Sequence, residues 1–287
     1  MTPDVAKWFD EHRPQKFELA SQYVNPTFVK VLKLIGLDKS YTRAEGCYLF
    51  DADGNRYLDC LSGYCVFNVG YNHPVVRQAL TDALAQNWPN MVQMDASPLS
   101  GILARELVNR APEGLDIVYF SNSGAEAVET AMKFARCATG RTRLVAARNA
   151  YHGCTYGALS LSGHPDTAQR GFRPVVPDCG LVAFNDAGAL EHELKRGDVA
   201  AFIVEPIQGE AGVVVPADDY LPAAQALCRK HGTLFVLDEI QTGLGRTGKF
   251  LAAEHWGLLP DIVCLAKSLS GGFVPVSATL TRRDIFL

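Results

Sequence analysis

Short apolar runs rich in β-branched residues alternate with helical patterns from about residue 99 onward. The runs are apolar along nearly their whole length, which is typical of strands buried on both faces. The segments between them show helical spacing of apolar residues and stop signals such as Gly140. This order predicts an α/β fold with a mostly parallel sheet and right-handed crossovers. The expected strands are 116–120, 142–147, 200–205, 233–239 and 261–266, and the expected helices are 99–110, 124–139 and 220–232.

Polar residues of different chemical types close four of these strands. The first strand runs into Ser-Asn-Ser-Gly at 121–124, and Glu205, Asp238 and Lys267 follow at the ends of three later strands. The spacings of 33 and 29 residues between the last three each correspond to about one βαβ unit. Because ligands bind at the carboxyl ends of parallel strands, we expect Glu205, Asp238 and Lys267 to share one crevice.

The first 60 residues have a different pattern. Helix fragments are followed by a turn-rich stretch, YLFDADGNRYLDCL, in which Asp53-Gly54-Asn55 predicts a hairpin. We therefore expect residues 1–60 to form a separate small element and residues 61–287 to form the large α/β domain. Hydrophobic residues make up 48% of the chain, which excludes disorder for most of it.

Charge and hydropathy exclude several classes of partner. The net charge of −4 argues against an electrostatic nucleic-acid binder. No apolar run approaches the roughly 18 residues of a membrane helix, and the N-terminus lacks the pattern of a signal peptide. The eight cysteines show neither C-x-x-C nor zinc-finger spacing, which favours small buried thiols over disulfides or a metal site. These features together predict a cytoplasmic protein.

The stretch GLGRTG at 243–248 matches the dinucleotide fingerprint G-x-G-x-x-G literally. It does not start at a strand end, and Asp261 opens its strand where a ribose-binding acid should close one. The P-loop alternative fails because Phe250 stands where Ser or Thr must reach a magnesium ion. A G-x-S-x-G nucleophile elbow is absent from the sequence.

The turn after the first expected strand offers an anion site. Free N–H groups of Gly124 and Ala125 at a helix N-terminus suit a phosphate, although Ser123 and Glu126 also fit a purely structural capping box. The two interpretations are compatible.

Three further residue types extend the predicted site. Asp238 needs a partner, which could be Gln241, an arginine or a protonated heteroaromatic nitrogen. Lys267 is the candidate amine, with a solvated surface lysine as the alternative. Tyr151 could cover a flat ring or be an ordinary loop aromatic. A phosphate cradle, an aromatic, a carboxylate and a lysine together meet the needs of pyridoxal 5′-phosphate (PLP).

At this point the chain resembles the class III aminotransferases, the ornithine, acetylornithine, 4-aminobutyrate and putrescine group of fold-type I PLP enzymes. The matching stretches cover roughly residues 45–280. They are DADGNRYLDCLSGY, SNSGAEAVETAMKFAR, AYHG, VEPIQGEAGV, LDEIQTGLGRTGKF and PDIVCLAKSLSGG.

The resemblance implies a role for each matched residue. Lys267 would form the Schiff base and act as general acid and base, and Asp238 would pair with the pyridine nitrogen. The cofactor-binding set would be Ser123, Gly124, Ala125, Tyr151, His152, Glu205, Asp238, Gln241 and Lys267, with Gln241 on the phenolic oxygen and Glu205 supporting Asp238 and Gln241. Residues 1–60 would belong to the small domain and 61–287 to the PLP-binding domain.

The substrates implied are a small-molecule amine or amino acid and a 2-oxo acid, and the implied assembly is a homodimer. Tyr64, Cys154 and Glu210 are the candidate substrate contacts. The ornithine and acetylornithine branches usually carry Arg after the aromatic-x-Gly, and Cys154 at that position cannot grip a carboxylate. The stretch GYCVFNVGYNHP is closer to the putrescine branch, so we expect an ω-amine donor.

Family members are longer than this chain. The Thr-Phe-Gly-Gly stretch and the C-terminal part with its substrate-binding arginine are expected after Lys267 and do not occur in the 287 residues. Two alternatives therefore stand beside the enzyme: a truncated inactive fragment, and a non-catalytic binding module that keeps the fold.

Overall fold

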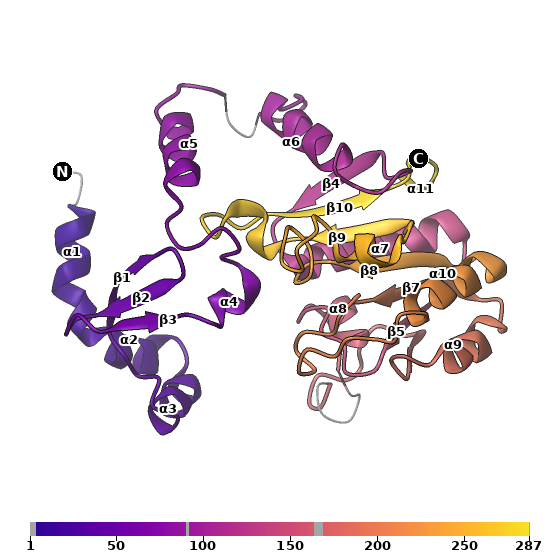
Figure 1. Cartoon of the computed structure of the whole chain (residues 1–287), viewed down its shortest axis with the longest axis horizontal. Helices are drawn as coiled ribbons and strands as arrows, with labels where there is room; N and C mark the ends of the chain where they lie inside the picture. Colours follow the sequence, from indigo (N-terminus) through magenta and orange to yellow (C-terminus); the bar gives the residue numbers. More distant parts are fainter. Residues whose placement is uncertain (1–3, 90–91, 164–168, 287) are drawn as a thin grey trace. The chain divides into compact units, whose positions relative to one another are not determined.

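The computed structural model describes residues 4–89, 92–163 and 169–286. The chain divides into two compact units, Met1–Cys60 and Leu61–Leu287 (Figure 1). Each unit is described separately below. The assignment of the first unit to a small domain and of the second to a cofactor-binding domain stays a prediction.

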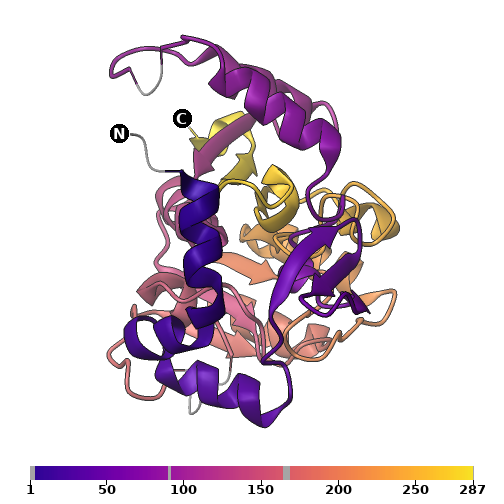
Figure 2. The same ribbon diagram turned by 90° about the vertical axis from the view of Figure 1, so that its left-hand side faces the viewer.

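The first unit combines short helices with a small antiparallel sheet (Figure 2). Strands β2 and β3 form the hairpin that Asp-Gly-Asn predicts, and β1 pairs with β2. Asp51 organises the turn, because its carboxylate accepts the N–H groups of Asp53 and Asn55 and the hydroxyl of Tyr57. The elements are α1 (Val5–His12), α2 (Lys16–Tyr23), α3 (Pro26–Leu34), β1 (Tyr41–Glu45), β2 (Tyr48–Asp51) and β3 (Arg56–Leu58).

The described part of the second unit contains a seven-stranded sheet in the order β4-β10-β9-β8-β7-β5-β6. The pairs β5–β6, β5–β7, β7–β8 and β8–β9 are parallel, while β10 is antiparallel to both β4 and β9. The mostly parallel α/β sheet is thereby confirmed. The strands are β4 (Ile117–Ser121), β5 (Arg143–Ala147), β6 (Cys179–Val182), β7 (Val199–Val204), β8 (Leu234–Asp238), β9 (Ile262–Leu265) and β10 (Ser277–Thr281).

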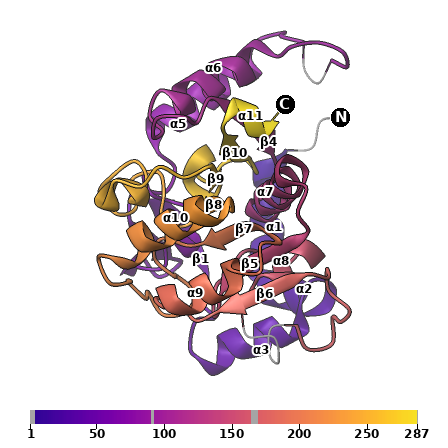
Figure 3. The ribbon, with the colours of Figure 1, turned by 90° about the vertical axis from the view of Figure 1, so that its right-hand side faces the viewer.

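Successive residues of the central strands are buried on opposite faces of this sheet. Phe202 and Val204 of β7 pack in the core under α9 and α10, whereas Ala201 and Ile203 pack with α7 on the other face. Figure 3 shows α7 and α8 on one side of the sheet and α9 and α10 on the other. Burial on both faces explains why these strands are apolar at every position.

The three helices that the sequence predicts in the second unit are present as α6, α7 and α10, within two residues of the expected bounds. Helix α7 begins after Ser123, whose hydroxyl accepts the N–H of Glu126, and ends at Gly140 with φ of 65°. The helices are α4 (Ser62–Cys65), α5 (Pro74–Leu84), α6 (Pro98–Val108), α7 (Gly124–Thr139), α8 (Tyr156–Ser160), α9 (Ala187–Leu194), α10 (Tyr220–His231) and α11 (Arg283–Phe286).

The short element α4 is a left-handed turn. Four consecutive residues have positive φ: Ser62 (51°), Gly63 (59°), Tyr64 (59°) and Cys65 (67°). Non-glycine residues in this region cost about 1–2 kcal/mol each, so the surrounding structure must hold the turn in place.

Two expectations from the sequence need correction. The expected set of strands was incomplete, because it contained neither β6 nor β10. The segment SATLT of β10 is short and carries hydroxyl residues. All five of its residues are nevertheless buried between two neighbouring strands. The thiols are not uniformly buried: Cys228 and Cys264 are, but Cys47, Cys60, Cys137 and Cys154 are exposed. A cysteine with apolar neighbours in the sequence is still exposed to solvent when its segment forms a loop or a surface helix.

Over the residues that the structure describes, no helix has the length and apolar character needed to cross a membrane.

Candidate functional site

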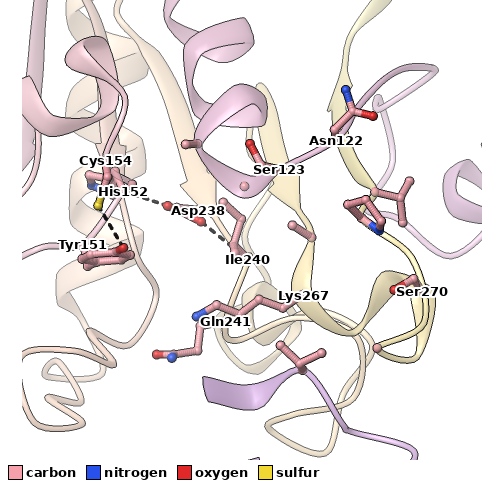
Figure 4. A pocket seen from close by; sticks show the side chains of 18 of the residues that line it. Asn122, Ser123, Tyr151, His152, Cys154, Asp238, Ile240, Gln241, Lys267 and Ser270 are labelled. Atoms are coloured by element: carbon pink, nitrogen blue, oxygen red, sulfur yellow. Dashed lines mark hydrogen bonds and ion pairs between the residues drawn. The ribbon is translucent and has the colours of Figure 1, made fainter. Parts of the chain in front are cut away.

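A cavity of about 640 Å³ opens at the carboxyl ends of the parallel strands in the second unit (Figure 4). Glu205, Asp238 and Lys267 all line it, as the strand-end argument predicts. Its volume lies in the range of small-molecule and cofactor sites. The other predicted residues on its wall are Ser123, Gly124, Ala125, Tyr151, His152, Cys154, Glu210 and Gln241.

One corner of the cavity is the N-terminus of α7. The Ser123 hydroxyl and the Glu126 carboxylate form the expected capping box, in which Glu126 accepts the N–H of Asn122 at 2.8 Å. The N–H groups of Gly124 and Ala125 have no hydrogen-bond partner within the described ranges. Both residues line the cavity, so two free donors and the positive end of a 16-residue helix face it. This corner is suited to a phosphate.

Asp238 and His152 form a buried pair on the cavity wall. The His152 Nδ1 atom lies 2.7 Å from Asp238 Oδ2, and the two side chains are 0% and 3% exposed. The other carboxylate oxygen accepts the N–H of Ile240. Burial alone would lower the pKa of His152, but the hydrogen bond and negative charge of Asp238 outweigh it and raise the pKa. His152 and the Ile240 N–H thus each hold one oxygen of the Asp238 carboxylate in place.

Glu205 lies beside this pair at the end of β7. Its carboxylate accepts the N–H groups of Tyr151 at 2.9 Å and of Gly209 at 3.3 Å. Burial raises its pKa to about 7, although the charge of His152 opposes the shift. Glu205 thus contacts two loops of the cavity wall. Gly209 in turn packs directly on the Gln241 side chain, since a Cβ on Gly209 would lie 1.3 Å from Gln241 Oε1. Glu205 is therefore connected to Gln241 through Gly209.

Lys267 follows β9 and begins a short 3-10 turn, Lys267–Ser270. Its φ of 46° is uncommon for a residue with a side chain. No hydrogen bond or ion pair of its amine occurs in the described part of the chain. Figure 4 shows the side chain extending along the cavity toward the side where Gln241 and Tyr151 lie. An unpaired amine on a strained backbone is typical of a functional lysine rather than a surface one.

The opposite wall carries Tyr151, which is 46% exposed, and Cys154. The Tyr151 hydroxyl lies 3.3 Å from Cys154 Sγ. This hydrogen bond, with burial and nearby negative charge, raises the pKa of Tyr151 to about 12. Nearby, Gln241 Nε2 donates to Glu210 Oε1 at 3.4 Å. The wall therefore offers a ring face, a thiol and a carboxylate.

A close packing contact joins the Tyr151 loop to the phosphate corner. Gly153 has φ of 126°, and a Cβ there would lie 2.6 Å from the Cβ of Ala125. Only glycine fits this position, because both the backbone conformation and the space exclude a side chain. The contact fixes the loop against the first turn of α7.

The structure adds wall residues that sequence reasoning missed. Ile240 packs against Gly124, where a Cβ would come within 2.9 Å of its Cδ1 atom. The segment 272–276 and Ser270 also line the cavity. The Gly-Gly pair at 271–272 was the available signal for a loop there, but the antiparallel return of β10 was not predictable from it. Tyr64 is exposed in the α4 turn and is not among the residues that line the cavity.

Two other chemistries find no support in the described residues. They contain no group of three or more potential metal ligands. Residues 243–248 form turns that lead to the 3-10 segment Ala252–Trp256, without the strand-to-helix context that a dinucleotide fingerprint needs.

Comparison with known proteins identifies the family. The sequence profile of the class-III aminotransferases matches residues 36–287. The chain belongs to this family. A putrescine aminotransferase of Pectobacterium atrosepticum is 45% identical over 278 residues, covering 92% of the chain, and the chain spans 59% of that relative's length. The ornithine aminotransferase of Toxoplasma gondii superposes with a TM-score of 0.89 at 35% identity, over all of this chain and 68% of that one.

The family depends on PLP, and another structure of the T. gondii enzyme holds PLP at partial occupancy in its active site. The residues of this chain fit the cofactor. Free N–H groups of Gly124 and Ala125 suit the phosphate, Asp238 suits a protonated ring nitrogen, and Lys267 suits an aldehyde. All of them face one cavity.

Proposed function

We propose that this cavity binds PLP and that the whole protein transfers an amino group from an ω-amine donor to a 2-oxo acid. The observation that carries the proposal is the unpaired amine of Lys267 in the same cavity as the Asp238–His152 pair and the α7 N-terminus. The putrescine and ornithine aminotransferases among its relatives support the same reaction class.

Each cofactor contact has a physical reason. The N–H groups of Gly124 and Ala125 with Ser123 hold the phosphate, and the Tyr151 ring covers one face of the pyridine ring. Asp238 keeps the ring nitrogen protonated, and His152 holds that carboxylate in position. Gln241 donates to the phenolic oxygen. When bound, PLP supplies an electron sink that stabilises negative charge at the donor's amine-bearing carbon.

Lys267 has two tasks in this proposal. Its Nζ atom is the covalent attachment point for the cofactor's aldehyde. When Nζ is not attached to the cofactor, it would be placed to take the proton from the donor's amine-bearing carbon as a general base.

The donor class follows from the wall opposite Lys267. No arginine lines the cavity among the described residues, and Cys154 occupies the position where the ornithine branches carry one. A donor without a carboxylate to be gripped, such as a diamine, fits this wall better than an α-amino acid does.

We also propose a cytoplasmic homodimer. Large apolar side chains are exposed along the segment from α4 to α6, which is more than a monomer usually leaves in contact with water. They include Val69, Val75, Leu84, Trp88, Leu99 and Ile102. The eight free thiols favour a reducing compartment.

The test begins with the cofactor. PLP added to the purified chain should produce an absorption band of the bound cofactor, and borohydride should fix the cofactor covalently on the peptide that contains Lys267. Lys267→Ala should lose both the band and the label. Lys249→Ala, an exposed lysine outside the cavity, should keep them. An unchanged band and label in Lys267→Ala would show that the lysine assignment is wrong.

The donor class has its own assay. Rates with putrescine, ornithine and acetylornithine are compared with a common 2-oxo acid acceptor, and putrescine should give the highest kcat/KM. A clear preference for acetylornithine would contradict the ω-amine proposal.

A further inference from the structure

The partly buried carboxylate of Glu129 on α7 does not belong to the cavity wall, yet it binds the segment that follows the Tyr151 loop. Its Oε1 atom accepts the Thr155 hydroxyl at 2.6 Å. The same atom accepts the N–H groups of Gly157 at 2.8 Å and Ala158 at 3.3 Å. Thr155 is the N-cap of α8, and its side chain makes no capping hydrogen bond. A side chain from another helix therefore supplies the acceptor for the first turn of α8.

The space beside this carboxylate admits only glycine. A Cβ on Gly157 would lie 2.3 Å from Glu129 Oε2 and 2.5 Å from Oε1. Gly157 is not among the glycines with positive φ, so its backbone conformation is open to other residues. Alanine is the better helix residue, and the nearness of Glu129 alone explains why glycine stands here. The sequence of α8 thus makes room for the contact at the expense of helix propensity.

Glu129 and the phosphate corner share one face of α7. Ala125 lies four residues before Glu129, and residues with this spacing are neighbours on a helix surface. Ala125 packs against Gly153, and Glu129 binds Thr155 one turn further along α7. Helix α7 is itself held in the core by its buried residues. Two successive turns of a fixed helix therefore hold the loop that begins at Tyr151.

This loop carries the side chain that we expect to cover the cofactor ring. Tyr151 and Cys154 both line the cavity, and the Tyr151 hydroxyl lies 3.3 Å from Cys154 Sγ (Figure 4). Glu205 holds the start of the loop by accepting the N–H of Tyr151. Cys154 directly precedes Thr155, whose hydroxyl donates to Glu129. A displacement of Thr155 would therefore move Cys154 and remove the partner of the Tyr151 hydroxyl.

We propose that Glu129 is a positioning residue that holds residues 151–155 against α7, so that the Tyr151 ring is in place before PLP binds. This inference rests on the proposed cofactor function and names a residue that preforms the cavity from outside it. A preformed loop raises the affinity, because the cofactor then binds without first having to order the loop. A carboxylate that served only to cap α8 would affect the stability of the chain and leave the affinity for PLP unchanged.

The test measures cofactor affinity and stability separately in each variant. PLP is titrated into the purified chain, and the absorption of the bound cofactor gives the half-saturation concentration. Urea unfolding of the cofactor-free chain gives the stability. Glu129→Ala should raise the half-saturation concentration about tenfold, the factor expected when the binding-competent loop falls to about a tenth of the population. Glu129→Gln should stay within about twofold of the wild type, because its amide oxygen can accept the same three hydrogen bonds.

Glu193→Ala is the matched control. The Glu193 carboxylate on α9 is also partly buried and accepts two hydrogen bonds from Arg143, which begins β5. The Tyr151 loop follows the other end of that strand. Glu193→Ala should lower the stability and leave the half-saturation concentration within about twofold of the wild type. Equal losses of affinity in Glu193→Ala and Glu129→Ala overturn the proposal, because they would follow from lower stability alone.

Gly157 provides a second variant that keeps Glu129 itself, and so tests the contact even where Glu129→Ala does not fold. In Gly157→Ala the new methyl group would displace the carboxylate, which is the flexible end of its side chain. The affinity for PLP should therefore fall about as far as in Glu129→Ala. In the double variant the methyl group meets no carboxylate, so the affinity should equal that of Glu129→Ala alone. Losses that multiply in the double variant overturn the proposal, because the two residues would then act independently.

The outcomes separate this inference from the proposed function. Wild-type affinity in both Glu129→Ala and Gly157→Ala overturns the role of Glu129 and leaves cofactor binding in place. A loss in Glu129→Gln as large as in Glu129→Ala does the same, since the hydrogen bonds would then not be what matters. A wild-type chain that shows no band of bound cofactor overturns both.

Discussion

The carboxyl of Glu205 provides a quantitative test of the site's electrostatics. Its pKa is raised from 4.5 to about 7 by burial. Between these two values the folded chain binds a proton that the unfolded chain has released, so stability falls as pH rises. Each pKa unit corresponds to about 1.4 kcal/mol, and the difference of about 2.5 units therefore costs the wild type about 3 kcal/mol by pH 8.

Glu205→Gln removes this titration while nearly keeping the shape of the side chain. Its amide oxygen can still accept the N–H of Tyr151, but the contact with the Gly209 N–H is lost, a cost of about 1 kcal/mol at every pH. The variant should therefore be slightly less stable than the wild type at pH 5 and more stable at pH 8. The two curves should cross between these values.

The assay is urea denaturation of the cofactor-free chain followed by circular dichroism at pH 5, 6, 7 and 8. At each pH we take the difference in unfolding free energy between the wild type and Glu205→Gln. The lost hydrogen bond shifts this difference equally at every pH, so its change with pH reports the titration of Glu205. Glu191→Gln is the matched control, because Lys230 and Lys195 lower the pKa of that carboxyl and leave it ionised throughout this range. A wild-type minus Glu205→Gln difference that stays within about 0.5 kcal/mol from pH 5 to 8 would refute the reasoning.

Two further substitutions test the contacts that hold the site together. Gly153→Ala should destabilise the chain by about 2 kcal/mol or more and weaken PLP binding, because the new Cβ would overlap Ala125 at a backbone φ of 126°. Thermal unfolding measures the first effect and cofactor titration the second. Wild-type values for both would contradict the packing argument. His152→Ala should cost about 3–5 kcal/mol near neutral pH by leaving Asp238 buried without its ion partner, whereas His152→Asn, which keeps a donor near the Nδ1 position, should cost less. Equal losses in the two histidine variants would indicate a packing role alone.

The sequence was informative about the site because polar residues mark the ends of apolar strands. Glu205, Asp238 and Lys267 stand at the ends of apolar runs that are typical of buried strands, and parallel strands bring their carboxyl ends to one edge. The capping signal at Ser123 and Glu126 is equally local, since the hydroxyl and carboxylate contact backbone N–H groups within four residues. The strand ends follow from the pattern of apolar residues along the chain, and the helix cap follows from contacts between residues close in sequence.

Contacts between distant segments were not accessible in this way. The pairing of His152 with Asp238 joins residues 86 positions apart, and the position of β10 between β4 and β9 depends on an antiparallel return that SATLT does not signal. The raised pKa of Glu205 likewise depends on how completely the segments packed around it exclude water.

For this protein, the sequence by itself determined the α/β class, the edge of the sheet where the polar residues meet, and the residue types that suit PLP. The tertiary structure decided which of these side chains are paired and which are free. Asp238 is paired with His152, whereas the amine of Lys267 has no hydrogen-bond partner among the described residues. The physical reason is that periodicity places a residue on a face or at an edge. Its partner, burial and charge state are set by segments that meet only when the chain folds.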